Sequence, residues 1–133
     1  MAHPPLPPGD DPTILDGATL WRRIPPIWWL KDPITGQYRL TSEAFDDSRD
    51  KTPMSVAIRD EIPGGTEAFL AGYVGNGIAA FTAGYARHTC HLAVARDPVP
   101  GEPWHVYVIG KKKPNVRKLL RDGCTMIVTP HET

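Results

Sequence analysis

A chain of 133 residues is long enough to bury the core of one domain and leaves little room for a second. Lys and Arg together number 15, as do Asp and Glu, so the formal net charge is zero. This balance excludes a protein built mainly for non-specific binding to nucleic acid or anionic membranes, because such proteins carry a basic excess. The apolar fraction of 41% and the charged fraction of 23% are typical of globular proteins.

The N-terminal residues 1–16 are expected to form a proline-rich extended arm, because five of the 15 prolines lie within the first 12 residues. We expect this arm to be a loose tail, the alternative being a strap across a partner or the domain itself. Residues 17–133 are expected to form a single domain. No apolar leader precedes them, so a cytoplasmic protein with reduced Cys90 and Cys124 is expected.

Three strands are predicted in the first half of the domain, at 18–24, 38–42 and 53–59. Proline residues end the first, and a turn at 31–37 precedes the second. The polar residues 43–52 are expected to form a loop or a single helical turn.

Two helices are predicted in the middle of the chain. A short one covers 66–73, and Asn76 is expected to cap a second, in which Ile78, Phe81 and Tyr85 would share one face. The uncharged run at 69–86 contains four glycines, which makes it poor material for a membrane span.

The last third is predicted to contain strands at 90–96, 104–110 and 124–130 and a helix at 114–122. The resulting order indicates the α+β class: a single mixed-sheet domain of about five or six strands with two or three helices. The last β-α-β unit would be parallel if its two strands share a sheet.

The strand-to-helix turn at 110–114 is a candidate anion site. Gly110 allows a ligand to approach the backbone, Lys111 and Lys112 add positive charge, and the first turn of the next helix offers free N–H groups. The P-loop spacing is absent and Pro114 removes one donor, so a solvated basic turn is the preferred interpretation. The segment 110–121 is also a weaker candidate for binding nucleic acid.

A second candidate ligand set is dispersed along the chain. Arg22 and Arg23 lie on the first strand, Arg39 and Ser42 on or near the second, and His105 on a late strand. Arginine on an apolar strand favours a bidentate contact with an anion, and histidine titrates near neutral pH, so His105 is the candidate catalytic residue. The simpler interpretation pairs these arginines with the acids of the chain.

No metal site is predicted, and no cofactor is expected other than a nucleotide or phosphate ligand. His88, Cys90 and His91 lie close together, but no spacing typical of a zinc site accompanies them. Trp28 and Trp29 are adjacent, so on a strand they would face opposite ways and one would be available to an interface.

The segments LWRRIPP, GQYRLTSEAF and PWHVYVIGKK carry R-x-x-P, G-x-x-R-x-[ST]-S-x-A-F and P-x-H-x-x-V-x-G-K patterns. These resemble a group of small bacterial proteins to which no established activity is attached. The early arginine and the R-x-[ST]-S segment are more distantly similar to ADP-ribosyltransferase-like and RES-type folds. That similarity implies NAD phosphate at Arg22 or Arg23, although no late strand supplies the expected glutamate.

The sequence therefore favours a non-enzymatic protein-interaction or accessory module of a bacterial operon, with a protein partner. A small nucleotide- or phosphate-binding protein, or an NAD-using enzyme, is the alternative. Nucleic-acid binding is the second alternative.

Overall fold

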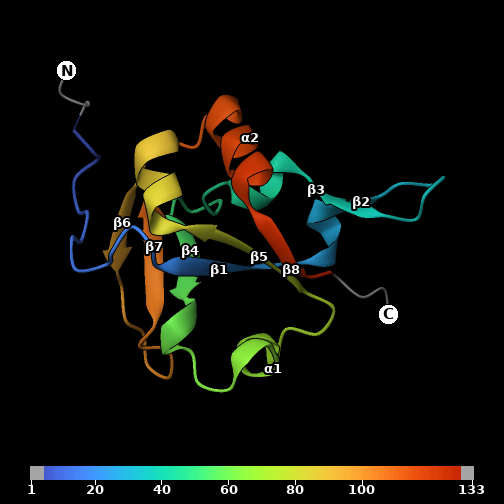
Figure 1. Ribbon diagram of the computed structural model, residues 1–133, viewed down its shortest axis with the longest axis horizontal. Coiled ribbons are helices and arrows are strands. Elements are labelled where there is room, and N and C mark those ends of the chain that lie inside the picture. The colour runs from blue at the N-terminus through green and yellow to red at the C-terminus, as the bar shows by residue number, and fades with distance from the viewer. Residues whose placement is uncertain (1–4, 130–133) are drawn as a thin grey trace.

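The computed structural model describes residues 5–129. Six strands form one sheet in the order β6-β7-β4-β1-β5-β8, and every neighbouring pair in it is antiparallel. Two short strands form a separate hairpin, β2–β3, which projects from one end of the molecule (Figure 1). The predicted α+β class is confirmed.

The helices and strands follow one another along the chain with these bounds: β1 Thr19–Ile24, β2 Trp29–Lys31, β3 Tyr38–Leu40, β4 Met54–Ile58, α1 Gly65–Leu70, β5 Gly77–Thr82, β6 Ala93–Arg96, β7 His105–Ile109, α2 Pro114–Gly123 and β8 Thr125–Val128. Short 3₁₀ turns cover Pro26–Trp28, Ser42–Phe45 and Arg59–Glu61, and a π-helical turn covers Tyr85–Thr89.

The sheet is covered on both faces (Figure 1). On one face, α2, the 42–45 turn and the 85–89 turn enclose the larger core, to which β1 contributes Leu20 and Ile24. On the other face, α1 covers a smaller cluster around Trp21 and Phe69. Because strand side chains alternate between faces, β1 supplies both cores and is the centre of the fold.

The predicted helix after Asn76 is wrong: residues 77–82 form strand β5. All six of its residues pair with β1, and five of the six are buried. A strand buried on both faces is a continuous apolar run, which periodicity alone does not separate from a buried helix. The apolar positions Ile78 and Phe81 fit either structure, and pairing with β1 decides between them.

The unit β7-α2-β8 is parallel, as predicted for strands of one sheet, although three strands lie between β7 and β8. Helix α2 ends at Gly123, and the ring of Tyr85 lies against this glycine. A Cβ at Gly123 would be 2.1 Å from a carbon of that ring, and the Tyr85 hydroxyl donates to the carbonyl of Leu119 at 2.6 Å. Close packing against this ring thus favours glycine at position 123.

The expected loose arm is wrong for residues 10–16, which are bound to the domain. The Arg87 side chain, only 6% exposed, donates to the carboxylate of Asp10 at 2.9 Å and to the carbonyl of Ile14 at 2.6 Å. Asp11 N–H also donates to the carbonyl of Val94 at 2.8 Å, and Ile14 is buried in the larger core. Residues 1–4 of the predicted arm lie outside the described residues.

Candidate functional site

The sequence-predicted site residues do not converge on one cavity. Arg22, Arg23 and His105 line a pocket of about 260 Å³ on the α1 side of the sheet. Arg39 and Ser42 line a different and larger pocket, of about 600 Å³, beside the β2–β3 hairpin. The turn residues Gly110, Lys111 and Lys112 line neither of these two.

Arg22 serves the fold rather than a ligand. Only Leu20 and Trp21 of β1 pair with β4. Beyond this pairing, the guanidinium of Arg22 lies between the two strands. Its Nε donates to the carbonyl of Ala44 at 2.6 Å and its Nη1 to that of Ser55 at 2.8 Å. Burial lowers the pKa of Arg22 to about 10, so it stays charged at neutral pH.

Arg23 also contacts groups of the protein itself. Its guanidinium lies 4.0 Å from the ring centres of both Phe69 and Tyr73, and it donates to the carbonyl of Phe69 and the carboxylate of Glu102. This arrangement ties α1 and the following loop to β1 through cation–π contacts and an ion pair. The position implied for NAD phosphate by the distant resemblance is therefore occupied by the protein's own groups.

His105 has one fixed nitrogen. Its Nδ1 lies 2.8 Å from the carbonyl oxygen of Asp97, which accepts, so Nδ1 carries a hydrogen and Nε2 is the acceptor in the neutral ring. The side chain is mostly buried at the edge of the small pocket. The two arginines that share this pocket each donate two hydrogen bonds to other groups of the protein.

The two candidate lysines of the basic turn differ in their exposure to solvent. Lys111 is exposed, whereas the side chain of Lys112 is 1% exposed and its ammonium donates to the Asp47 carboxylate at 2.8 Å. The carbonyls of Val108 and Gly110, both at 2.9 Å, accept its two remaining hydrogens. Lys112 therefore has no free N–H to offer an anion. Gly110 itself has φ of 140° and little space around its Cα.

Of the two predicted interface tryptophans, Trp29 is buried and its indole N–H donates to the carbonyl of Ile24 at 3.1 Å. Trp28 is half-buried against the larger core, with the Arg22 guanidinium 5.8 Å from its ring. In this conformation only Trp28 can contribute area to an interface.

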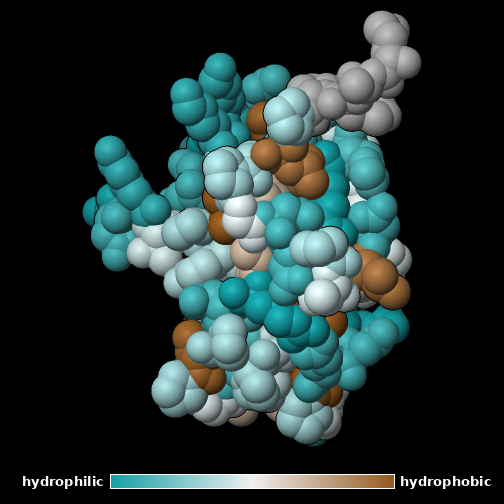
Figure 2. Space-filling view, turned by 90° about the vertical axis from the view of Figure 1, so that its left-hand side faces the viewer, coloured by the Kyte–Doolittle hydropathy of each residue, from teal (hydrophilic) through white to brown (hydrophobic). Residues whose placement is uncertain are grey.

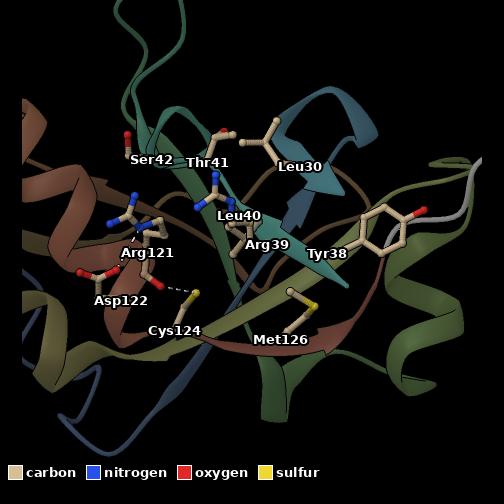
Figure 3. A pocket seen from close by; sticks show the side chains of 10 residues that line it. All are labelled: Leu30, Tyr38, Arg39, Leu40, Thr41, Ser42, Arg121, Asp122, Cys124 and Met126. Atoms are coloured by element: carbon tan, nitrogen blue, oxygen red, sulfur yellow. Dashed lines mark hydrogen bonds and ion pairs between the residues drawn. The ribbon is translucent and has the colours of Figure 1, made fainter. Parts of the chain in front are cut away.

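The larger pocket is the second candidate site (Figure 3). The hairpin and the residues after it form one wall, and the end of α2 with β8 forms the other. The hairpin wall comprises Leu30, Tyr38, Arg39, Leu40, Thr41 and Ser42, and the opposite wall comprises Arg121, Asp122, Cys124 and Met126. We call this pocket the hairpin groove.

The hairpin groove is basic at one end and apolar at the other. Figure 3 shows the guanidinium groups of Arg39 and Arg121 at the same end as Ser42, while Tyr38 and Met126 lie at the other end. Arg121 Nε donates to the adjacent Asp122 at 2.9 Å, so the three charged groups leave one net positive charge. Such a groove fits a ligand that combines an apolar part with a carboxylate or another anion.

The thiol of Cys124 in the groove wall is protonated at neutral pH. Burial raises the pKa of its thiol to about 11, and the thiol donates to the carbonyl of Arg121 at 3.1 Å. Within residues 5–129, no cluster of three or more His, Cys, Asp or Glu side chains is arranged to hold a metal ion. The protonated thiol of Cys124 gives no support to covalent catalysis in the groove.

The hairpin that forms one wall of the groove and the 3₁₀ turn Pro26–Trp28 directly before it expose apolar side chains. Ile27 is 81% exposed, Leu30 47% and Ile34 92%. The hairpin extends away from the main sheet (Figure 1). By contrast, the side of the molecule that carries β6 shows mostly polar residues, with apolar ones in small separate patches (Figure 2).

Sequence reasoning found Arg39 and Ser42 and missed Arg121, Cys124 and Met126. In the sequence Arg121 belongs to the basic segment 110–121, and its position on the last turn of α2 gives no sign of which side chains it meets. No family profile, curated protein or solved structure matches the chain. No helix among the described residues is long and apolar enough to cross a membrane.

Proposed function

We propose that the protein is a non-enzymatic interaction module, an accessory subunit that presents the β2–β3 hairpin to a protein partner. The observation that carries this proposal is the exposure of Leu30 and Ile34 on the projecting hairpin, together with that of Ile27 in the 3₁₀ turn directly before it. Burying an isoleucine side chain contributes about 1.5–3 kcal/mol, so a partner that covers Ile27 and Ile34 gains substantially from them. Neither Ile27 nor Ile34 is part of either core of the domain, so these two side chains do not stabilise the isolated chain through burial.

The alternatives have less support. A phosphate-bearing ligand at Arg22 and Arg23 would have to displace contacts that hold β1, α1 and the 42–45 turn together. Two of the basic residues in 110–121, which would have to bind nucleic acid, are paired with acids of the chain. Lys112 forms an ion pair with Asp47, and Arg117 lies 3.5 Å from the carboxylate of Asp46. The basic segment thus carries less free charge than its sequence indicates.

A paired-variant isolation experiment tests the proposal. Tagged wild-type protein is recovered from its native cells beside Ile27→Ser/Ile34→Ser and the control Leu15→Ser/Val74→Ser, which alters two exposed apolar residues outside the hairpin. We expect the same partner with wild type and control, and its loss with the hairpin variant at unchanged melting temperature. Equal recovery with all three proteins, or no recovery with any, would contradict the proposal.

A further inference from the structure

The wall of the hairpin groove is the edge of a strand. Tyr38, Arg39 and Leu40, which are the whole of β3, all line the groove. Consecutive residues of a strand point to opposite faces, so three in a row line one groove only when the edge of the strand faces it. β3 pairs with β2 on one side, and its other side has no strand partner within residues 5–129.

The hydrogen bonds of the hairpin show which backbone groups of β3 face β2. Thr41 N–H donates to the carbonyl of Trp28 at 2.9 Å, and Asp32 N–H donates to that of Gln37 at 2.8 Å. In an antiparallel ladder, hydrogen-bonded pairs alternate with non-hydrogen-bonded pairs. Arg39, midway between these two bonded positions, therefore also directs its backbone N–H and C=O to β2.

By the same alternation, the backbone N–H and C=O groups of Tyr38 and Leu40 point away from β2 toward the groove. No hydrogen bond among the described residues occupies them. Two N–H and two C=O groups thus line the groove at the spacing that an additional strand requires.

The side chains define what that strand should carry. Tyr38, Leu40 and Met126 pack against the larger core, so they form an apolar surface below the edge of β3. Arg39 points to the opposite face of the small sheet, because it is one residue from both Tyr38 and Leu40. Within residues 5–129 its guanidinium has no hydrogen-bond partner, and the same holds for the terminal nitrogens of Arg121.

We propose that the hairpin groove binds an extended peptide segment of the partner as a third strand on β3. Side chains of this segment opposite Tyr38 and Leu40 would be apolar and lie on Met126. The residue between them, opposite Arg39, would be Asp or Glu and would accept hydrogen bonds from Arg39 and Arg121. The recognised pattern is therefore apolar–acidic–apolar. This inference rests on the proposed interaction function and names the kind of segment that the hairpin takes.

Peptide selection tests the inference without knowledge of the partner. A displayed library of random dodecapeptides is selected on the purified full chain, and the enriched peptides are synthesised with a fluorescent label. We expect them to share the apolar–acidic–apolar pattern. Arg39→Gln should weaken their binding about tenfold or more, since charge-assisted hydrogen bonds are lost. Arg59→Gln, which alters an exposed arginine outside the groove, should leave it within about twofold.

Methylating the peptide amides one at a time distinguishes strand addition from side-chain docking. Methylation of amides that donate to β3 should weaken binding about tenfold or more, and methylation of the alternate amides should change it little, giving a period of two. A flat response along the peptide would overturn strand addition. Failure to enrich any peptide over the Arg39→Gln protein would overturn the groove as a peptide site.

The two proposals fail in different ways. If Ile27→Ser/Ile34→Ser abolishes partner recovery but Arg39→Gln does not, the hairpin is the interface and the peptide groove is refuted. If the purified chain forms a dimer that Arg39→Gln abolishes, the occupant is a second copy of this chain, and the assignment to a partner peptide is refuted.

Discussion

Replacing Lys112 with methionine should destabilise the fold strongly. The sequence gives no sign of this, because Lys112 lies in a run of three lysines that are expected to be exposed to solvent. Its ammonium is buried and donates to the Asp47 carboxylate and to the carbonyls of Val108 and Gly110. Methionine retains the aliphatic length of lysine but supplies no donor. The substitution therefore removes the charge and all three hydrogen bonds while changing the packing little.

The magnitude follows from the partners. Removing one member of a buried ion pair costs about 3–5 kcal/mol, because the other charge stays desolvated. Asp47 is 30% exposed and keeps a hydrogen bond from Met54 N–H at 3.0 Å, so water and this donor recover part of the loss. We therefore expect a decrease of about 3 kcal/mol in the free energy of unfolding. For a domain of this length that corresponds to a melting temperature about 10 °C lower.

Urea denaturation followed by circular dichroism measures the effect, with Lys111→Met as the matched control. Lys111 is exposed and should change the free energy of unfolding by no more than about 0.5 kcal/mol. The slope of free energy against urea should be the same in all proteins, which establishes that the unfolded states are comparable. A Lys112 variant within 1 kcal/mol of the Lys111 variant would refute a structural role for this lysine.

Three further predictions concern the core, a glycine and an acid-sensitive loop. Ile14→Ala should lower the free energy of unfolding, measured by urea denaturation, by about 2–5 kcal/mol. The control Leu15→Ala, at an exposed neighbour, should change it little. Equal effects of the two substitutions would show that residues 10–16 form a loose arm after all. Gly123→Ala should lower the melting temperature by several degrees because its Cβ would overlap the ring of Tyr85, and an unchanged melting temperature would contradict this packing. Hydrogen bonds hold the pKa of Asp50 at about 2, below its usual 3.8. Its contribution to stability is therefore complete above pH 3.8 and lost as the pH falls toward 2, so the difference between wild type and Asp50→Asn should shrink over that range. A difference independent of pH would refute it.

The strand predictions succeeded where the sequence carries a pattern of period two between clear breakers. β7 alternates inward Val106 and Val108 with partly exposed neighbours, and a proline turn precedes it. β5 failed because a central strand, buried on both faces, has no alternation to detect. Its identity depends on β1, which lies more than fifty residues earlier in the chain.

The candidate site was predictable only in part, for a related reason. The sequence places arginines on or near strands, but it does not show which acceptors each one meets. Arg22 and Arg23 find carbonyls and a carboxylate of their own chain, whereas no acceptor among residues 5–129 bonds to the guanidinium of Arg39. The distinction depends on the hairpin lying beside α2 and β8, which is a tertiary contact.

Photo-crosslinking from the hairpin tip tests the central claim most directly. Benzoylphenylalanine replaces Ile34, which is 92% exposed, and in a control protein it replaces Leu15, which is 72% exposed and lies outside the hairpin. After illumination of native cells, the account predicts one discrete adduct with another protein from position 34, absent from position 15 and lost when Ile27 is also changed to serine. No adduct from position 34, or the same adducts from both positions, would contradict an interaction module that works through its hairpin.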